Sequence, residues 1–120
     1  MELDELTYTI RGSVFEANRV LGSGFLEKVY ERALLVELRQ QGLKAESQVP
    51  ITVKYKSEII GEYFGDIVVG DRIILELKAV DSLQKIHEAQ VLNYLKATGY
   101  KIGLLTNFTH PKAEIRRFVL

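Results

Sequence analysis

The chain lacks cysteine and tryptophan, and it has only two prolines and two histidines among its 120 residues. The absence of cysteine excludes disulfide bonds, thiolate metal ligands and a cysteine nucleophile. Two histidines, His87 and His110, are too few for a histidine-rich metal site. No apolar run approaches the roughly 18 residues of a membrane-spanning helix. The acidic start, residues 1–5, lacks the layout of a signal peptide, so we expect a cytoplasmic protein.

The chain also has no excess of basic over acidic residues, or of acidic over basic ones. Sixteen basic residues balance sixteen acidic ones, which gives a formal net charge of +0. A domain that holds nucleic acid by charge alone is usually plainly basic, so the composition does not favour that role. Residues 96–120 depart from the balance, with five lysines and arginines against Glu114. That quarter is either a solvated basic edge or part of a nucleic-acid groove.

The chain does have enough apolar residues for one ordinary core. Hydrophobic residues make up 47% of it and charged residues 27%, which excludes a disordered chain, a collagen-like repeat and a coiled-coil rod. The length suits a single domain over residues 1–120.

Hydrophobic spacing predicts the order of helices and strands. Apolar residues three or four apart predict helices over residues 4–20 and 25–41, separated by Gly22-Ser23-Gly24. Alternating and continuous apolar runs predict strands over 51–55, 58–69 and 72–79, paired as an antiparallel meander. A third helix is predicted from Asp81-Ser82 to Thr98, capped by Asp81 with Gln84 as its capping-box partner.

Two further strands complete the predicted α/β fold. Residues 101–106 read as a buried strand that the third helix makes parallel to its neighbour, and residues 115–119 read as an edge strand. The prediction is a mixed sheet flanked by helices.

Three charged residues interrupt the buried strands. Glu76 and Lys78 lie two apart in an otherwise apolar strand, so both side chains leave the same face. Asp66 is the matching interruption of the preceding strand, and a hairpin around residues 70–71 brings it near the level of Glu76. Two carboxylates suit Mg²⁺ or Mn²⁺, and a lysine can stabilise charge on a reacting phosphate. A partly buried ion pair involving Lys78 explains the same spacing equally well.

Two helices carry further candidates. Gln90 interrupts an apolar stripe on the third helix and needs a polar partner, which the strand of Glu76 or the backbone could supply. On the same stripe, His87 is a general base, a phosphate contact or, more often for a lone histidine at a helix edge, an ordinary surface residue. Glu27 suits the positive end of the second helix. It is three residues from Tyr30 and becomes a third carboxylate of the site if their shared face meets the sheet.

These residues together resemble the GxxExxY proteins, a small family within the PD-(D/E)xK nuclease superfamily. The resemblance covers nearly the whole chain, in segments that keep their order: Gly24-Phe25-Leu26-Glu27-Lys28-Val29-Tyr30, Tyr63-Phe64-Gly65-Asp66, Ile74-Leu75-Glu76-Leu77-Lys78-Ala79-Val80, 88–96 and 103–108. It implies a restriction-endonuclease-like core, which is a mixed sheet flanked by helices.

The resemblance also implies roles for individual residues. Asp66, Glu76 and Lys78 match the catalytic aspartate and the ExK pair, and Gln90 matches a glutamine on the following helix. Metal ligands would be Asp66, Glu76, the carbonyl of Leu77 and Glu27. Two residues depart from the pattern: Gly65 stands where the superfamily name has proline, and Asn18 stands where relatives often carry histidine. Any contribution of that histidine to activity is missing here.

The expected function is a metal-dependent phosphodiesterase, with Mg²⁺ or Mn²⁺ as cofactor and DNA favoured over RNA. One alternative is an inactive module that binds nucleic acid or protein and retains the nuclease fold. Another is a structural subunit whose carboxylates do nothing. A homodimer that joins two sites along a duplex stays open at this size.

Overall fold

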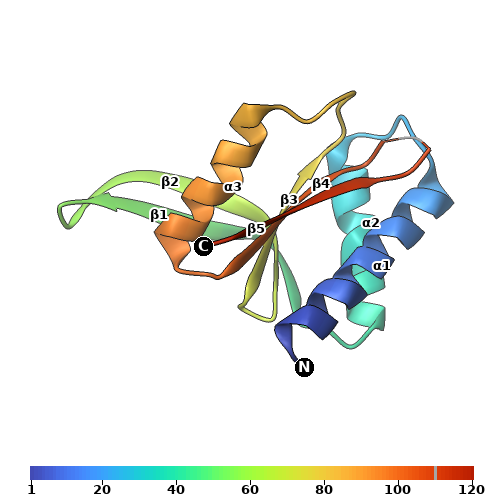
Figure 1. Cartoon of the computed structure of the whole chain (residues 1–120), viewed down its shortest axis with the longest axis horizontal. Coiled ribbons are helices and arrows are strands. Elements are labelled where there is room, and N and C mark those ends of the chain that lie inside the picture. The colour runs from blue at the N-terminus through green and yellow to red at the C-terminus, as the bar shows by residue number, and fades with distance from the viewer. Residues whose placement is uncertain (110) are drawn as a thin grey trace.

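The computed structural model describes residues 1–109 and 111–120, so His110 lies outside the described residues. Figure 1 shows a mixed sheet with helices on both sides of it. The elements in chain order are α1 (Leu3–Leu21), α2 (Glu27–Gln40), β1 (Ala45–Tyr55), β2 (Glu58–Val69), β3 (Ile73–Lys78), α3 (Lys85–Thr98), β4 (Ile102–Asn107) and β5 (Glu114–Val119). Within the described part of the chain, no helix is long and apolar enough to cross a membrane.

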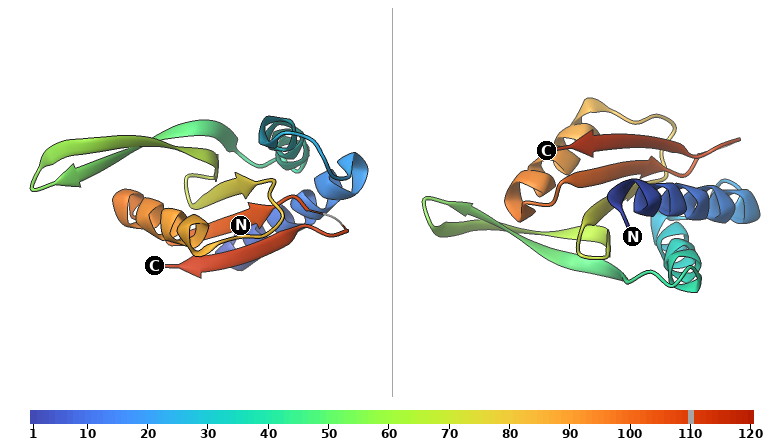
Figure 2. Two further views of the ribbon diagram at one scale, coloured as in Figure 1. Left: turned by 90° about the horizontal axis from the view of Figure 1, so that it is seen from above. Right: turned by 60° about the horizontal axis from the view of Figure 1, so that its bottom comes forward.

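The five strands form one sheet in the order β1-β2-β3-β4-β5. The first three pair as an antiparallel meander, and β4 lies parallel to β3 because α3 carries the chain back across the sheet. The edge strand β5 pairs antiparallel with β4. The predicted mixed sheet, the antiparallel meander and the parallel pairing of β4 are therefore confirmed. The β1–β2 hairpin extends well beyond the body of the sheet (Figure 2).

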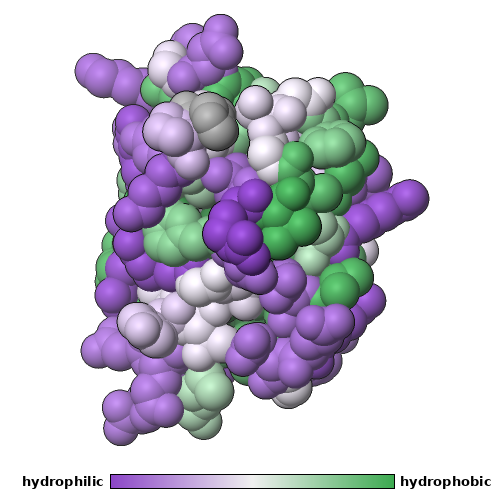
Figure 3. All heavy atoms as spheres, turned by 90° about the vertical axis from the view of Figure 1, so that its right-hand side faces the viewer, coloured by the Kyte–Doolittle hydropathy of each residue, from purple (hydrophilic) through white to green (hydrophobic). Residues whose placement is uncertain are grey.

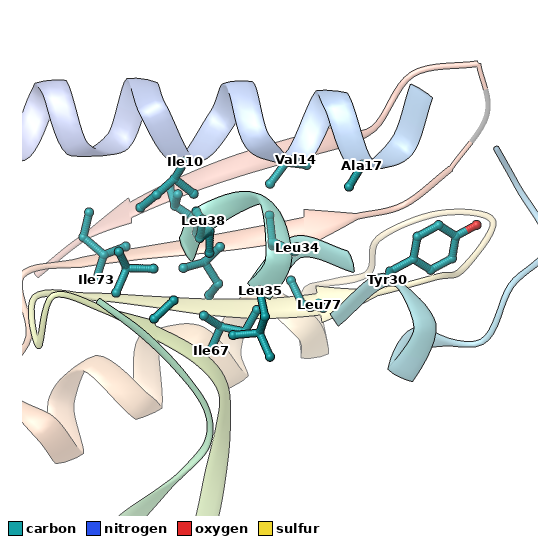
Figure 4. Close-up of a cluster of buried hydrophobic side chains, with 14 of the residues drawn as sticks. Ile10, Val14, Ala17, Tyr30, Leu34, Leu35, Leu38, Ile67, Ile73 and Leu77 are labelled. Carbon is teal, nitrogen blue, oxygen red and sulfur yellow. The ribbon is translucent and has the colours of Figure 1, made fainter. Parts of the chain in front are cut away.

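One face of the sheet packs against α1 and α2. Leu34 and Leu38 of α2 and Ile10 of α1 are fully buried at helical spacing. They meet Ile67 and Ile73 of the sheet in the larger hydrophobic core, where Figure 4 shows the side chains pointing toward one another. This packing fixes α2 over the part of the sheet that carries the charged residues.

The helix α3 packs on the opposite face, and Gly103 of β4 permits its close approach. A Cβ atom at Gly103 would lie 2.5 Å from Cγ1 of Val91, whose side chain is fully buried. Tyr94 and Leu95 of the same helix form a second core with Ile74 of β3. The sheet is therefore covered on both faces in its centre.

Two predicted boundaries are wrong. Strand β1 begins at Ala45 rather than at residue 51, because Pro50 lies within an edge strand, where a missing N–H is tolerated. Helix α3 begins at Lys85, and its N-cap is Gln84 rather than Asp81. The cause is a local hydrogen bond: the backbone N–H of Gln84 donates to Nδ1 of His87 over 3.0 Å. This bond caps the helix one turn later than predicted.

Candidate active site

Asp66 and Glu76 lie side by side where the pairing of β2 with β3 stops. The last paired residues of that ladder are Ile67 and Leu75. Beyond them, the carboxylates replace the backbone acceptors: Asp66 N–H donates to Oε1 of Glu76 over 3.3 Å, and Leu77 N–H donates to Oδ2 of Asp66 over 2.8 Å. The structure therefore brings the two predicted carboxylates together.

Burial, followed by a neighbouring carboxylate, raises the pKa of each of the two carboxyl groups. Glu76 is only 2% exposed, and burial, followed by the charge of Asp66, raises its pKa to about 8. The pKa of Asp66 is also raised, mainly by burial and further by Glu31, although its bond from the Leu77 N–H acts in the opposite direction. Two desolvated like charges are unfavourable together, and a bound cation would relieve both effects.

Lys78 ends β3 next to this pair and is half-buried. Among the residues that the structure describes, it makes no ion pair within 4.0 Å. Its charge nevertheless lowers the pKa of Glu27, Asp66 and Glu76, so it lies within electrostatic reach of all three. This arrangement does not show the structural ion pair that the spacing also allowed.

The glycine-rich turn before α2 places Glu27 at the same site. Glu27, Asp66 and Leu77 line one small hollow of about 80 Å³. Burial raises the pKa of Glu27, the charge of Lys78 lowers it and that of Asp66 raises it. Glu27 therefore lies beside the sheet residues Asp66 and Leu77, which is the condition under which it could join the site.

Tyr30 has a different role from Glu27, although the two share a motif. Its fully buried ring stacks on Phe108 with 4.5 Å between ring centroids. Its hydroxyl donates to the carbonyl of Gly22 over 2.6 Å and accepts a longer bond of 3.4 Å from the N–H of Phe25. Tyr30 therefore anchors the turn that positions the first residue of α2. Figure 3 views this end of the molecule, where hydrophobic side chains lie among strongly hydrophilic ones.

Two residues that were not predicted, Glu31 and Gln48, also line the hollow. Glu31 is buried, and its two oxygens accept from Nζ of Lys28 and Nε2 of Gln48, each over 2.7 Å. The amide of Gln48 also lies 3.5 Å from Oδ1 of Asp66. The four-residue spacing of Glu27 and Glu31 could have indicated the first residue, because residues four apart share a helix face. Nothing in the sequence indicates Gln48.

The predicted partners of Gln90 are wrong. Its amide donates to the hydroxyl of Tyr94 over 2.9 Å, one turn along α3, rather than to the strand of Glu76 or to backbone. The other polar helix candidate, His87, accepts the capping bond from Gln84. On α1, the buried side chain of Asn18 donates to the carbonyl of Thr109 over 3.1 Å, which ties α1 to the segment after β4.

The donor set suits a small hard dication. In the described residues, no three acidic or histidine side chains form a ready coordination group. Mg²⁺ does not require one, because it commonly binds one or two carboxylates and keeps several waters. Asp66 and Glu76 supply two adjacent carboxylates whose pKa values are raised mainly by burial and further by a neighbouring carboxylate. The residues present therefore fit such an ion.

Comparison with known proteins agrees with this geometry. A family model described as the PD-(D/E)XK nuclease superfamily matches residues 4–118. No curated protein sequence matches the chain. Among solved structures, the chain is similar to SSO0001, with a TM-score of 0.61, 17% identity and 77% of this chain covered. It spans about half of that protein, covering 48% of its length.

A second similar structure is an alkaline exonuclease, LHK-Exo, from Laribacter hongkongensis. The TM-score is 0.56 and the identity 11%, and the alignment covers 98% of this chain and 70% of the exonuclease. At these identities both structures support the fold alone. Since the family model spans nearly all of the sequence, the chain belongs to the PD-(D/E)XK nuclease superfamily.

Proposed function

We propose that this protein is a metal-dependent phosphodiesterase that cleaves nucleic acid, with DNA favoured over RNA. The observation that carries the proposal is the convergence of Asp66 and Glu76 at the end of a strand ladder, beside a lysine without an ion-pair partner among the described residues. Membership of a nuclease superfamily supports the same chemistry.

Each residue of the site has a distinct task in this proposal. Asp66, Glu76 and the carbonyl of Leu77 hold Mg²⁺ or Mn²⁺, and Glu27 joins them directly or through water. When bound, the cation polarises the scissile phosphate and lowers the pKa of a bound water. The ammonium of Lys78 orients the attacking water and stabilises the negative charge that develops on the phosphoryl oxygens.

Gln90 has a supporting task. Its amide donates to Tyr94 on the helix that covers β3, and in this proposal it contacts the substrate strand rather than the cation. Below the site, the side chain of Asn107 makes two bonds with the backbone of Val80, of 2.9 and 2.8 Å. These bonds hold the segment just after Lys78 in place.

The main competing function is an inactive binding module that retains the fold. The sequence retains every predicted side chain of the site: Glu27, Asp66, Glu76, Lys78 and Gln90. A binding module without catalytic activity would gain nothing from Lys78, because an ammonium group opposes cation binding rather than assisting it. The presence of Lys78 therefore favours the enzyme.

The experiment compares the wild type with Lys78→Met on duplex, single-stranded, flapped and branched DNA and RNA, with Mn²⁺ and with chelator. Methionine keeps most of the volume of the lysine stem and removes its charge. We expect cleavage by the wild type only with the metal, and a loss of about 10²- to 10³-fold in the variant. Calorimetry should show Mn²⁺ affinity in the variant equal to or above that of the wild type.

The melting temperature of the same preparations provides the control. If Lys78 were half of a structural pair, its loss would cost roughly 3–5 kcal/mol of stability without metal. A folded Lys78→Met protein that cleaves as fast as the wild type would remove the lysine from the mechanism. Absence of wild-type cleavage on every substrate would favour the binding module, and wild-type cleavage that persists in chelator would refute the metal dependence. Sedimentation with and without duplex would test the homodimer.

A further inference from the structure

A groove of about 1060 Å³ lies between the β1–β2 hairpin and α3. The hairpin supplies one wall through residues 50–54 and Tyr63. The other wall comes from α3 and the residues just after it: Ile86, His87, Ala89, Gln90, Asn93, Tyr94, Lys96, Ala97, Thr98 and Tyr100. Figures 1 and 2 show the hairpin running alongside α3 beyond the covered part of the sheet. Of the residues with a task in the function proposed above, only Gln90 lines this groove.

The charge of the groove differs from that of the whole chain. Among its described lining residues there is no aspartate or glutamate, whereas Lys54 and Lys96 are present on opposite walls. Both lysines are exposed. In a chain with a net charge of +0, a large concave surface without acidic residues is complementary to an anionic ligand.

The groove also presents aromatic rings. Three of the chain's six tyrosines line it: Tyr63 from β2, Tyr94 from α3 and Tyr100 beyond that helix. The rings of Tyr63 and Tyr94 lie 5.8 Å apart at 46°. Because Tyr63 keeps 50% of its surface exposed, a planar group can stack on it without moving the core.

The groove leads to the candidate active site. Gln90 lines it and binds Tyr94, and the charges of Glu76 and Asp66 both contribute to raising the pKa of that tyrosine. Tyr63 precedes Asp66 by three residues on the same strand. A strand lying in the groove would therefore contact Gln90 and lie within electrostatic reach of the carboxylates.

The size of the groove favours an unpaired strand over a duplex. A volume of about 1060 Å³ is at the top of the range for pockets that enclose one small organic ligand, which suits a few nucleotides. A DNA duplex is far larger than this protein groove, because the major groove of the duplex alone is about 12 Å wide. In a duplex the flat faces of the bases are also stacked and cannot reach a tyrosine.

We propose that this groove binds an unpaired polynucleotide strand, with bases stacked on Tyr63 and phosphates paired with Lys54 and Lys96. Binding requires no catalysis, but delivery of the strand to the carboxylates rests on the proposed nuclease function. The enzyme would therefore act on single-stranded segments such as overhangs or flaps.

The test is fluorescence anisotropy of labelled dT12 and U12 with the full-length protein in chelator, where no metal-dependent turnover occurs. Tyr63→Ala should weaken binding by about 5- to 100-fold, the effect expected for one lost base stack. The control Tyr8→Ala removes a tyrosine that is 79% exposed on α1 and should leave affinity unchanged. The ratio of dT12 to U12 affinity separates DNA from RNA as the strand, and tight binding of either supports the groove.

Salt dependence gives an independent readout. Loss of two phosphate contacts in Lys54→Ala/Lys96→Ala should lower the slope of log K against log salt by about 1.4, whereas exposed Lys101→Ala should not change it. Equal affinity for a blunt 12-bp duplex, or wild-type binding by both groove variants, would overturn the proposal. If the groove proposal fails in this way, metal-dependent cleavage could still support the nuclease function. Conversely, strand binding without cleavage would support the groove proposal and reject the nuclease function.

Discussion

We expect Glu76 to make the metal-free protein less stable as the pH rises. Its pKa is raised from 4.5 to about 8 by burial and by the neighbouring charge of Asp66, and Lys78 opposes this only in part. Because the folded-state pKa lies above the unfolded one, folding takes up a proton between these values. The stability that Glu76 contributes is fully present below about pH 4.5 and is lost as the pH rises through about 8.

The magnitude follows from the two pKa values. The difference between 4.5 and about 8, at ~1.4 kcal/mol per pKa unit, corresponds to a loss on the order of 5 kcal/mol. A typical domain has only about 5–15 kcal/mol of stability in total. The variant Glu76→Gln keeps the shape of the protonated acid but cannot ionise, so it should escape this loss.

The assay is urea unfolding in chelator at pH 5.5, 7.0 and 8.5 for the wild type and Glu76→Gln. The pKa values of Asp66 and Glu27 are also raised, but these groups titrate in both proteins, so the difference between the two pH profiles reports on Glu76. We expect the wild type to lose several kcal/mol more than the variant over this range. Added Mn²⁺ should restore the wild type at pH 8.5 far more than the variant. Parallel pH profiles would refute this account of the site.

Two further predictions concern the scaffold, both measured by urea unfolding. Gly103→Ala should destabilise the protein by ~1–3 kcal/mol because the new methyl group meets Val91, whereas Gly12→Ala, with open space around the new atom, should stabilise α1 by ~0.5–1 kcal/mol. Equal effects of the two changes would contradict the close packing of α3. Tyr30→Phe should cost ~1–2 kcal/mol, since the carbonyl of Gly22 loses its donor, and an unchanged midpoint would show that this bond does not hold the turn.

Most of the fold could be predicted from hydrophobic spacing because each element buries one regular face. The run Ile73-Ile74-Leu75 indicated a strand covered on both sides, and a helix between it and the next strand required parallel pairing. The start of α3 was predicted one turn too early, because aspartate is a favoured N-cap residue and glutamine is not. The observed start depends on a local bond, from the backbone N–H of Gln84 to Nδ1 of His87.

The basic C-terminal quarter shows how sequence charge can mislead. Arg116 forms ion pairs with Glu88 of α3 and with Glu114. Nη2 of Arg117 lies 3.6 Å from Oδ1 of Asp4 on α1. Most acidic partners of this segment come from elsewhere in the chain, so a local count overstates its free charge. Neither arginine is among the residues that line the groove, whereas Lys96 at the start of the quarter is.

The site was only partly predictable, because the sequence shows which residues break a pattern but not how the backbone bends around them. Asp66, Glu76 and Lys78 were visible as charges within apolar strands. Gln48 was not, because its importance depends on a backbone φ of +51°, which a non-glycine residue rarely adopts. Glu31 was hidden for a related reason, since its partner is that same glutamine.

The bend at Gln48 connects the active site to the groove. Ser47 pairs with Ile67 and Val49 with Gly65, so the register places Gln48 opposite Asp66, yet these two do not pair within the described ladder. On the other side, the β2–β3 ladder stops at Ile67. At Asp66, strand β2 therefore forms no ladder pair with either β1 or β3 in the described part of the sheet. This break in pairing turns the Asp66 side chain toward the N–H of Leu77 and lets the hairpin beyond it leave the sheet. One local break in pairing thus creates both the acidic site and the wall of the groove that leads to it.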